Sequence, residues 1–430
     1  MNAPKRRAVI VAGNRTPFVR AFQEYLPYDA IALSGFAVQG LLDRTGLDKR
    51  EVQSIVWGGV ILPNGAPNVG REVALDLGFP AETEAMTVTR ACASGLQAIT
   101  LAAAAIERGE YDVAIAGGAD STSNATLGMP PSFIRKVGPV AMSGKATFGQ
   151  WLKVLASLNG GDVVPQKPSI RERVTGELMG ESAENMAERN QISREAQDAF
   201  AAQSHQRAAA AIAAGTFDAE VTPVTLKNGK IVAADTIPRG DSSAEKLAKL
   251  KPAFKKDGTL TAGNSSTLTD GAAAVLIMSE EKARALGYTP LAFFRSWSFC
   301  GVDPRDQLLM GPAIAVPQAL AKAGLELRDV TRVDIHEAFA SQVLSVLKMM
   351  GSDAFCRQRL GRDAAVGEVD PDRLNVLGGS LAFGHPFGAT GARMVTSMSH
   401  ELHRLGSGST AVLGICAAGG LGAAAVLEAC

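Results

Sequence analysis

Two distant segments of the sequence follow one pattern, in which an amphipathic helix is followed by a glycine, a buried strand and a glycine pair. Between residues 92 and 118, apolar side chains at helical spacing lead to Gly109, a short apolar run and a Gly-Gly step. Between residues 391 and 420 the same order returns around Gly406. Helices that alternate with buried strands are typical of α/β folds. The pattern fits a duplicated α/β domain, and two ordinary helix–strand units are the alternative.

The length and composition favour an α/β fold with more than one domain. A chain of 430 residues exceeds the roughly 100–200 residues that one domain usually holds, so we expect two or three domains. Hydrophobic residues make up 46% of the chain, aromatic residues only 5%, and glycine occurs 45 times. This composition favours closely packed helices and strands with tight turns over an aromatic-rich β-sandwich.

The charges and cysteines restrict the partners and the compartment. The 43 Lys and Arg balance the 43 Asp and Glu, so the chain has no net positive charge to attract nucleic acid. No nucleic-acid partner is expected. The cysteines are scattered, odd in number and without a C-x-x-C pair, which argues against a disulfide framework and against a metal site. They are Cys92, Cys300, Cys356, Cys416 and Cys430. Reduced thiols predict a cytoplasmic protein.

The N-terminal residues and the hydropathy predict a soluble chain. The apolar run at residues 8–12 is too short for the core of a signal peptide, and we expect it to form the first buried strand. No apolar run approaches the ~20 residues of a membrane span, so membrane contact is not expected.

A segment whose composition differs from that of both halves, from about residue 128 to residue 252, separates them. It contains an Ala-rich, helix-like run at 194–215 and a turn-rich stretch at 227–256 in which lysines outnumber acids. We interpret the segment as an insertion. The basic stretch is a candidate for contact with phosphates, although a charge run is more often a solvated surface.

Five apolar side chains in this insertion recur at helical spacing and would form a stripe along one face of a helix. It consists of Phe148, Trp151, Leu152, Leu155 and Leu158. Such a stripe usually packs against its own protein, and this is the interpretation that we favour. Contact with a membrane surface or a partner is the alternative.

Cys92 lies where the first amphipathic helix begins. The unpaired N–H groups and the positive end of the helix dipole are expected to lower the pKa of its thiol. A thiolate there can attack a carbonyl carbon while the same N–H groups stabilise the oxyanion. A lone cysteine, however, is more often a small core residue.

Three further residues stand at strand ends or helix starts. His385 lies in a glycine-rich turn before a helix, and it is a candidate base because a P-loop's Lys and Ser/Thr are missing at the required spacing. His336 follows the apolar run at 330–335, and Cys416 ends the last apolar strand. In α/β sheets ligands bind at such strand ends. A capping histidine and a buried thiol are the alternatives.

These residues resemble the motifs of the thiolase family. A C-x-S-G motif, a G-H-P-x-G-A-T/S-G loop and a terminal C-x-x-G-G loop occur in the family in this order, and they stand here around Cys92, His385 and Cys416. The similarity runs nearly end to end, through residues 15–18, 261–266 and 270–274. Residues 247–254, 306–312, 336–339 and 416–420 are most similar to the thiolase (β) subunit of the fatty-acid oxidation trifunctional complex.

The resemblance implies a fold and a domain organisation. The family fold has two similar halves in a five-layered α-β-α-β-α arrangement. It implies an N-terminal thiolase domain at 1–285, interrupted by the loop-domain insertion at about 128–252, and a C-terminal domain at 286–430. It also implies a homodimer or homotetramer and a possible complex with a hydratase/dehydrogenase subunit.

The resemblance also implies the roles of the site residues. Cys92 takes the acyl group after His385 removes its proton, and Cys416 exchanges the α-proton of the substrate. One oxyanion site is expected from His385 with a water molecule or His336, and the other from the N–H groups of Cys92 and Ala418. Coenzyme A is implied as a substrate, without a permanently bound cofactor, and CoA or substrate contacts are expected from Ser266, Phe339 and Met310.

The activity implied is 3-ketoacyl-CoA thiolysis in fatty-acid β-oxidation. An acetyl-CoA C-acetyltransferase that works in the biosynthetic direction is the nearest alternative. A decarboxylating ketoacyl synthase would share a Cys-His-His set, but it has no need of a second thiol such as Cys416. A non-enzymatic subunit with a thiolase fold is a further alternative, and the three intact motifs argue against it.

Overall fold

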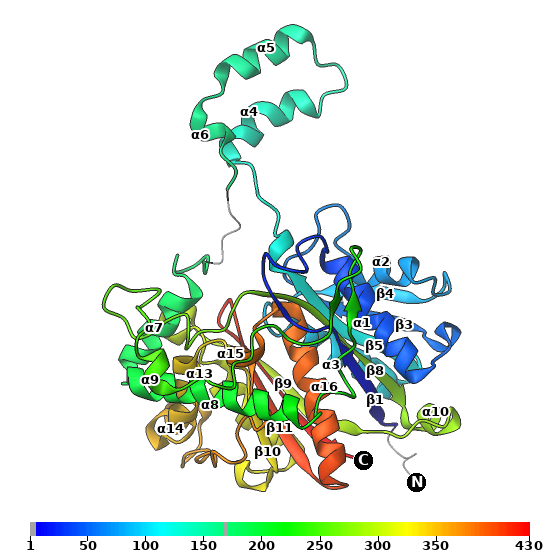
Figure 1. The fold of residues 1–430 in the computed structure, drawn as a ribbon, viewed down its shortest axis with the longest axis vertical. Helices are drawn as coiled ribbons and strands as arrows, with labels where there is room; N and C mark the ends of the chain where they lie inside the picture. Colours follow the sequence, from blue (N-terminus) through cyan, green and yellow to red (C-terminus); the bar gives the residue numbers. More distant parts are fainter. Residues whose placement is uncertain (1–5, 167–170) are drawn as a thin grey trace. The chain divides into compact units, whose positions relative to one another are not determined.

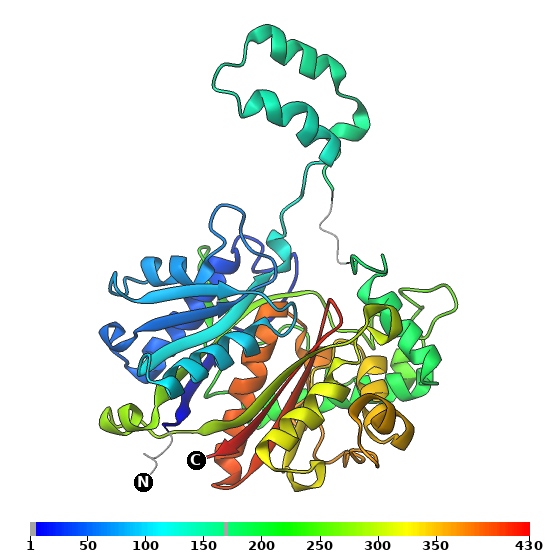
Figure 2. The ribbon, with the colours of Figure 1, turned by 180° about the vertical axis from the view of Figure 1, so that it is seen from behind.

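The computed structural model describes residues 6–166 and 171–430 of the chain (Figures 1 and 2). These residues form two compact units. The larger unit comprises residues up to 124 and from 171 to the C-terminus, and the smaller lies within residues 125–170. No helix among the described residues is long and apolar enough to cross a membrane.

The larger unit is built on a mixed ten-stranded sheet with two halves. The N-terminal half has the strand order β4-β3-β5-β8-β1, and the C-terminal half has the order β10-β11-β12-β9. The halves join where β1 pairs with β9, at Val9–Phe293 and Ile10–Ala292. The strand bounds are β1 (Ala8–Arg15), β2 (Val19–Arg20, beside β8), β3 (Ser54–Gly58), β4 (Glu84–Val88), β5 (Val113–Ser121), β8 (Thr269–Ser279), β9 (Ala292–Gly301), β10 (Arg332–Ile335), β11 (Thr410–Ala417) and β12 (Leu421–Ala429).

Helices form three layers around the two half-sheets. Helices α3 (Ser94–Arg108) and α16 (Phe387–Leu405) lie in the middle, where their apolar faces share one core with strands of both halves. Helices α1 (Ala30–Thr45) and α2 (Val69–Asp76) cover the outer face of the N-terminal half. Helices α12 (Gly311–Ala323) and α13 (Ala340–Met350) cover the C-terminal half. The predicted five-layered α/β fold is therefore confirmed.

The two helix–strand units predicted from the sequence are both present. In the first, α3 ends at Gly109 and leads to β5; in the second, α16 ends at Gly406 and leads to β11. Both glycines have a positive φ, 79° and 96°. The duplicated architecture follows from these equivalent units, since each helix packs in the middle layer between the half-sheets.

Residues 171–252 belong to the larger unit. They contribute α7 (Met179–Arg189), α8 (Arg194–Ala213), α9 (Ala244–Leu247) and the small β6–β7 ribbon (Val224–Thr225 and Ile231–Val232). Buried ion pairs attach this segment to the first strand, because Arg15 binds both Glu220 and Asp235, at 3.0 and 2.7 Å. The separate unit is thus shorter than the predicted insertion at 128–252. The division into thiolase domains at 285 and 286 stays a prediction.

The remaining elements of the larger unit are short helices and turns. They are α10 (Glu280–Ala285), α11 (Pro304–Gln307), α14 (Asp353–Leu360), α15 (Ser380–Phe383) and the 3₁₀ turns at Lys49–Glu51, Thr122–Asn124 and Leu327–Asp329.

The smaller unit contains α4 (Pro131–Ala141), α5 (Phe148–Ser157) and α6 (Gly160–Val163). The predicted helix at the apolar stripe is confirmed as α5, and within the smaller unit its apolar side chains are left uncovered. Phe148, Leu152 and Leu155 are 78%, 51% and 58% exposed. Two short helices can bury only their facing sides, so the outer side of α5 lacks a partner within this unit. Packing against another part of the same protein, and contact with a partner or a membrane surface, both stay predictions.

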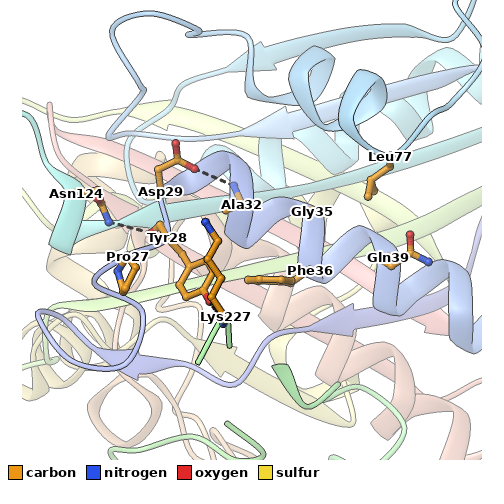
Figure 3. Close-up of a pocket in the computed structure, with 10 residues that line it drawn as sticks. All are labelled: Pro27, Tyr28, Asp29, Ala32, Gly35, Phe36, Gln39, Leu77, Asn124 and Lys227. Carbon is orange, nitrogen blue, oxygen red and sulfur yellow. Dashed lines mark hydrogen bonds between the residues drawn. The ribbon is translucent and has the colours of Figure 1, made fainter. Parts of the chain in front are cut away.

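A surface pocket of about 600 Å³ lies over α1 (Figure 3). Its polar groups already bind protein atoms. The Asp29 carboxylate accepts the N–H of Ala32 and caps α1, while Asn124 donates to the carbonyl of Tyr28. The Tyr28 hydroxyl accepts the N–H of Lys227. None of the four predicted catalytic side chains lines this pocket, and its polar groups serve the fold.

Candidate active site

A strained turn places Cys92 in front of α3. Ala91 has a φ of 45°, a left-handed conformation that costs a non-glycine residue roughly 1 kcal/mol or more. The Ser94 hydroxyl stabilises the turn, since it accepts the N–H of Arg90 at 2.8 Å and donates to the carbonyl of Ala91 at 2.6 Å. The thiol is thereby held at the helix start, as the sequence predicted.

Glycines bring the N-termini of α3 and α16 into contact. A methyl group added at Gly95 would overlap the carbonyl oxygen of Gly388, and one at Gly391 would lie 2.6 Å from the backbone nitrogen of Leu96. Only glycine permits this approach of two helix starts. Because Cys92 precedes one helix and His385 precedes the other, the crossing brings the two motifs together.

The Gly95→Ala variant tests this crossing. We expect the free energy of unfolding to fall by about 1–3 kcal/mol, because the helices must separate to fit the methyl group. Catalytic activity should fall further, by about 10²-fold, since a displacement of about 1 Å between reacting groups has that effect. Denaturant unfolding and kcat/KM measure the two quantities.

Gly35→Ala is the matched control, because Gly35 is half-buried in α1 and its added methyl group meets nothing within 4 Å. It should gain about 0.5–1 kcal/mol of stability and leave activity unchanged. Equal behaviour of the two variants would contradict the role of the crossing.

The two histidines lie against each other, with ring centroids 4.3 Å apart. His336 follows β10, and its Nδ1 lies 3.1 Å from the Ser380 hydroxyl. Nδ1 of His385 lies 2.7 Å from the Thr390 hydroxyl. Both Nε2 atoms are buried and have no hydrogen-bond partner among the described residues. Each ring is therefore held through Nδ1 and keeps Nε2 for a substrate atom.

A buried carboxylate holds the loop that carries His385. Asp120, at the end of β5, accepts the N–H groups of Gly388 at 2.6 Å, Val60 at 3.0 Å and Ile61 at 2.5 Å. It thereby caps α16, whose own N-cap, Pro386, has no capping side chain. Burial raises the pKa of Asp120 to about 7. Asp120 could not be predicted as a site residue from the sequence, because nothing local to it signals contact with residues so distant in the chain.

The protonation states differ from the expected thiolate. Burial raises the pKa of Cys92 to about 11, and the N–H groups of Ala418 and Cys92 offset only part of this effect. Burial and the nearby charge of Arg393 lower the pKa of His385 to about 3. The expectation of a lowered thiol pKa is therefore wrong, because desolvation outweighs the helix N-terminus. The site rests as a neutral thiol and a neutral imidazole, so deprotonation must accompany the attack.

This state predicts the pH dependence of Cys92 alkylation. The thiolate fraction should grow about tenfold per pH unit until the pKa of about 11, because a raised pKa keeps the thiol protonated at every lower pH. The rate constant for iodoacetamide, followed as the mass of the Cys92 peptide, should rise from pH 7 to pH 10 without a plateau. A free small thiol with a pKa of about 8.5 is the control, because its alkylation rate constant should stop rising once the pH passes that pKa. A Cys92 plateau below pH 8 would show a preformed ion pair instead.

Cys416 and Ala418 complete the surroundings of Cys92. Cys416 is buried at the end of β11, and its pKa is raised well above the ordinary value by burial and by the neighbouring Cys92. The N–H of Ala418 is directed at the Cys92 sulfur, as is the N–H of Cys92 itself. The two amides predicted to bind an oxyanion therefore face the same atom.

Two loops place the predicted CoA-contacting residues side by side. The Ser266 N–H donates to the carbonyl of Ala338, and the Ala340 N–H donates to the carbonyl of Asn264, both at 3.0 Å. Phe339 meets Phe254 edge to face at 5.8 Å. Met310 is buried at the start of α12, in the same apolar cluster as Phe339 and Cys416.

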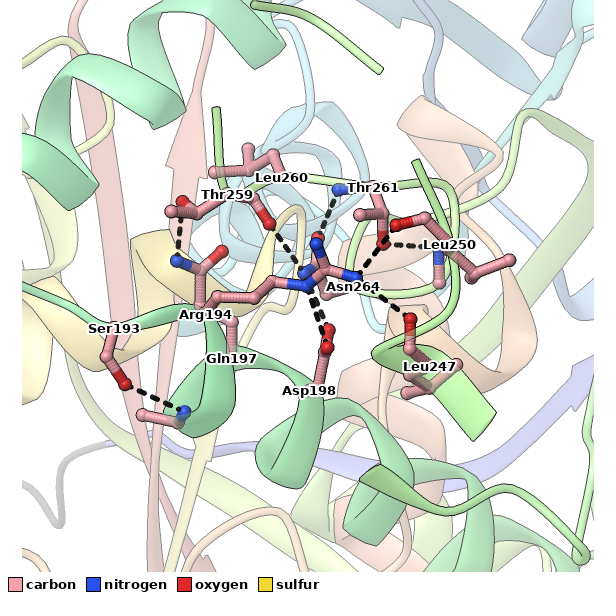
Figure 4. Close-up of polar contacts among 12 residues, drawn as sticks. Ser193, Arg194, Gln197, Asp198, Leu247, Leu250, Thr259, Leu260, Thr261 and Asn264 are labelled. Atoms are coloured by element: carbon pink, nitrogen blue, oxygen red, sulfur yellow. Dashed lines mark hydrogen bonds and ion pairs between the residues drawn. The ribbon is translucent and has the colours of Figure 1, made fainter. Parts of the chain in front are cut away.

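A polar network behind these loops fixes the Ser266 loop (Figure 4). Arg194 binds the Asp198 carboxylate at 2.7 Å and donates to the carbonyls of Leu247 and Leu250. Asp198 in turn accepts from the side-chain amide of Asn264 at 2.9 Å. The network shows how the segment around residues 247–254 is coupled to the loop that carries Ser266.

Comparisons with known proteins agree with this site and fold. The family model for the N-terminal domain of thiolase matches residues 8–281, and that for the C-terminal domain matches residues 288–429. A 3-ketoacyl-CoA thiolase of Pectobacterium carotovorum is 46% identical over 427 residues, which cover 98% of this chain and 96% of that protein.

Solved structures are similar as well. The Bacillus anthracis acetyl-CoA acetyltransferase is 34% identical with a TM-score of 0.84, and 99% of each chain is covered. Human mitochondrial 3-ketoacyl-CoA thiolase in complex with CoA is 34% identical with a TM-score of 0.82, covering 99% of this chain and 98% of that one. The chain belongs to the thiolase family.

Proposed function

We propose that this chain is a 3-ketoacyl-CoA thiolase, an acyltransferase of fatty-acid β-oxidation. The observation that carries the proposal is that His336 lies against His385 and Cys416 lies near Cys92, while the contact between the starts of α3 and α16 brings the Cys92 and His385 motifs together. The curated relative that shares 46% identity carries the same name. A second thiol beside the nucleophile is what a Claisen enzyme requires, because an α-proton must be moved as the carbon-carbon bond breaks or forms.

The first half-reaction transfers the acyl group. His385 takes the proton of Cys92 while the sulfur attacks the 3-keto carbon of the substrate. The bond between carbons 2 and 3 then breaks, and its electron pair leaves as the enolate of acetyl-CoA. Cys416 protonates the enolate, acetyl-CoA departs, and the shortened acyl chain remains as a thioester on Cys92.

The second half-reaction releases the product. The thiol of a second CoA gives its proton to the Cys416 thiolate left by the first half-reaction and attacks the thioester, and Cys92 leaves with the proton that His385 returns. The N–H groups of Cys92 and Ala418 stabilise the oxyanion in both steps. Nε2 of His336, with that of His385, stabilises the enolate oxygen of acetyl-CoA. Run backwards, the sequence is a condensation.

Coenzyme A enters as a substrate, and no permanently bound cofactor is proposed. Ser266, Phe339 and Met310 are proposed to contact CoA or the acyl chain. Support comes from the similar human thiolase, whose structure is a complex with CoA, and from the contact between the two loops that carry Ser266 and Phe339.

We also propose a homodimer or homotetramer in the cytoplasm, with a hydratase/dehydrogenase subunit as a possible further partner. Strand β4 lies at the end of the strand order, with Met86 39% exposed, and offers an edge for pairing with a second copy. The scattered, unpaired cysteines support the cytoplasmic location.

Steady-state thiolysis of a series of 3-ketoacyl-CoA substrates, from four to sixteen carbons, tests the function. Turnover should extend to chains longer than acetoacetyl-CoA. Turnover confined to acetoacetyl-CoA would identify an acetyl-CoA acetyltransferase. Malonyl-dependent condensation without thiolysis would identify a decarboxylating synthase, and no turnover with any substrate would identify a subunit without activity.

A further inference from the structure

The loop that presents the Ala418 amide is a short hairpin turn with little internal support. It joins β11 to β12, which pair directly at Ala417 and Leu421. Gly419 and Gly420 both have positive φ, 83° and 68°. Glycines in such a turn can adopt several conformations at small cost, so the direction of the Ala418 N–H depends on contacts from outside the turn.

One outside contact fixes the far side of the turn. The backbone N–H of Val302, just after β9, donates to the carbonyl of Gly420 at 2.6 Å. This bond holds the start of β12, but it does not restrain the peptide between Ala418 and Gly419. A second contact is needed to fix that peptide.

That group is Glu172. Its Oε2 accepts the N–H of Gly419 at 2.9 Å, although the two residues are far apart in the sequence. The Glu172 side chain is buried, with 7% of the residue exposed, whereas Gly419 itself lies at the surface. Such a bond to a carboxylate is charge-assisted and roughly twice as strong as one between neutral groups.

Glu172 is itself held rigidly. Its N–H donates to the carbonyl of Glu177, its carbonyl accepts the N–H of Gly176, and its Oε1 accepts the N–H of Val174. The carboxylate therefore projects from a closed turn, and it can act as a fixed point for the hairpin.

We infer that Glu172 is a positioning residue for acyl transfer: by holding the Ala418–Gly419 peptide it fixes the backbone torsions of Ala418, and thereby the direction of the adjacent Ala418 N–H toward the oxyanion formed on Cys92. The inference rests on the proposed function, because it assumes that an acyl group is transferred to Cys92. Glu172 does not touch the reacting atoms, and it acts through the Gly419 amide.

The test compares two reactions of the same thiol. In the first, acetyl-CoA acylates Cys92: the sulfur–carbonyl bond forms, the bond to the CoA sulfur breaks, and CoA leaves with the thiol proton. This reaction passes through an oxyanion and needs the Ala418 N–H. In the second, iodoacetamide alkylates Cys92 by displacement of iodide, and no oxyanion forms. Only a defect in the oxyanion site separates the two rates.

We expect Glu172→Ala to lower the acylation rate constant by about 10- to 100-fold, because a misplaced donor loses most of its contribution. The alkylation rate constant should stay within about twofold of wild type. Glu172→Gln, which keeps an acceptor oxygen, should recover part of the acylation rate. Both rates are followed as the mass change of the Cys92 peptide, with thermal unfolding measured alongside.

Glu177→Ala is the matched control. Glu177 lies in the same turn and accepts from the Ser182 hydroxyl and the Asn185 side-chain amide, and not from the hairpin. It should change neither rate. If Glu172→Ala leaves acylation unchanged, or lowers acylation and alkylation equally, the inference is overturned. If the wild-type protein is not acylated at Cys92, the proposed function fails instead.

Discussion

Replacement of Cys92 by alanine should abolish thiolysis, with kcat lowered by at least about 10⁴-fold. The sulfur is the only atom proposed to carry the acyl group between substrates, and no neighbouring side chain can replace it. Cys416 is buried, and its thiol pKa is raised well above the ordinary value. Steady-state thiolysis and the mass of the acylated peptide measure the effect.

The fold of this variant should be retained. Cys92 is only half-buried in front of α3, and the turn around it is held by Ser94 and by the backbone rather than by the thiol. Thermal unfolding should therefore change little. Cys300→Ala is the control, because it removes another half-buried thiol from the end of β9 and should keep full activity. An active Cys92→Ala protein would remove Cys92 from the role of nucleophile.

The parts of the site that depend on neighbours in sequence were predictable. Cys92 lies at a helix start, His385 in a glycine-rich turn before a helix, and Cys416 at a strand end, and the structure has all three in these settings. Local patterns set these positions because helix starts and strand ends are determined by residues close by in the chain.

The protonation of the site could not be predicted in this way. The position of Cys92 suggested a lowered thiol pKa, but burial raises it to about 11. Burial arises from the packing of both half-sheets around α3 and α16, which a local pattern does not contain. The contacts of Asp120 with Gly388 and of Glu172 with Gly419 were missed for the same reason.

The surface that covers the apolar stripe could not be predicted for a related physical reason. The spacing of Phe148, Leu152 and Leu155 identified the helix, yet an amphipathic pattern does not say which surface covers its apolar face. The favoured interpretation assumed packing against the same chain. In the small unit these side chains are exposed, because its few helices present too little surface to cover them.

Replacement of Cys416 by serine should separate the two chemical roles of the site. Acylation of Cys92 by acetyl-CoA should persist, since the N–H groups that face Cys92 belong to the backbone. Exchange of the α-proton of acetyl-CoA should fall by about 10²- to 10⁴-fold, the contribution typical of a general acid or base. A serine hydroxyl has nearly the size of the thiol but is far less acidic, so it can neither take nor return the proton.

The position of Cys416 explains why this loss should be so large. Burial and the adjacent Cys92 keep the Cys416 thiol protonated in the resting site, so it is ready to protonate the enolate when the carbon-carbon bond breaks. Deuterium incorporation into acetyl-CoA in D₂O measures the exchange, and the mass of the Cys92 peptide measures acylation in the same sample. Cys300→Ser, at the other half-buried thiol, should leave both rates at the wild-type level. Unchanged exchange in Cys416→Ser would mean that another group moves the α-proton, and the proposed Claisen mechanism would then lose its second thiol.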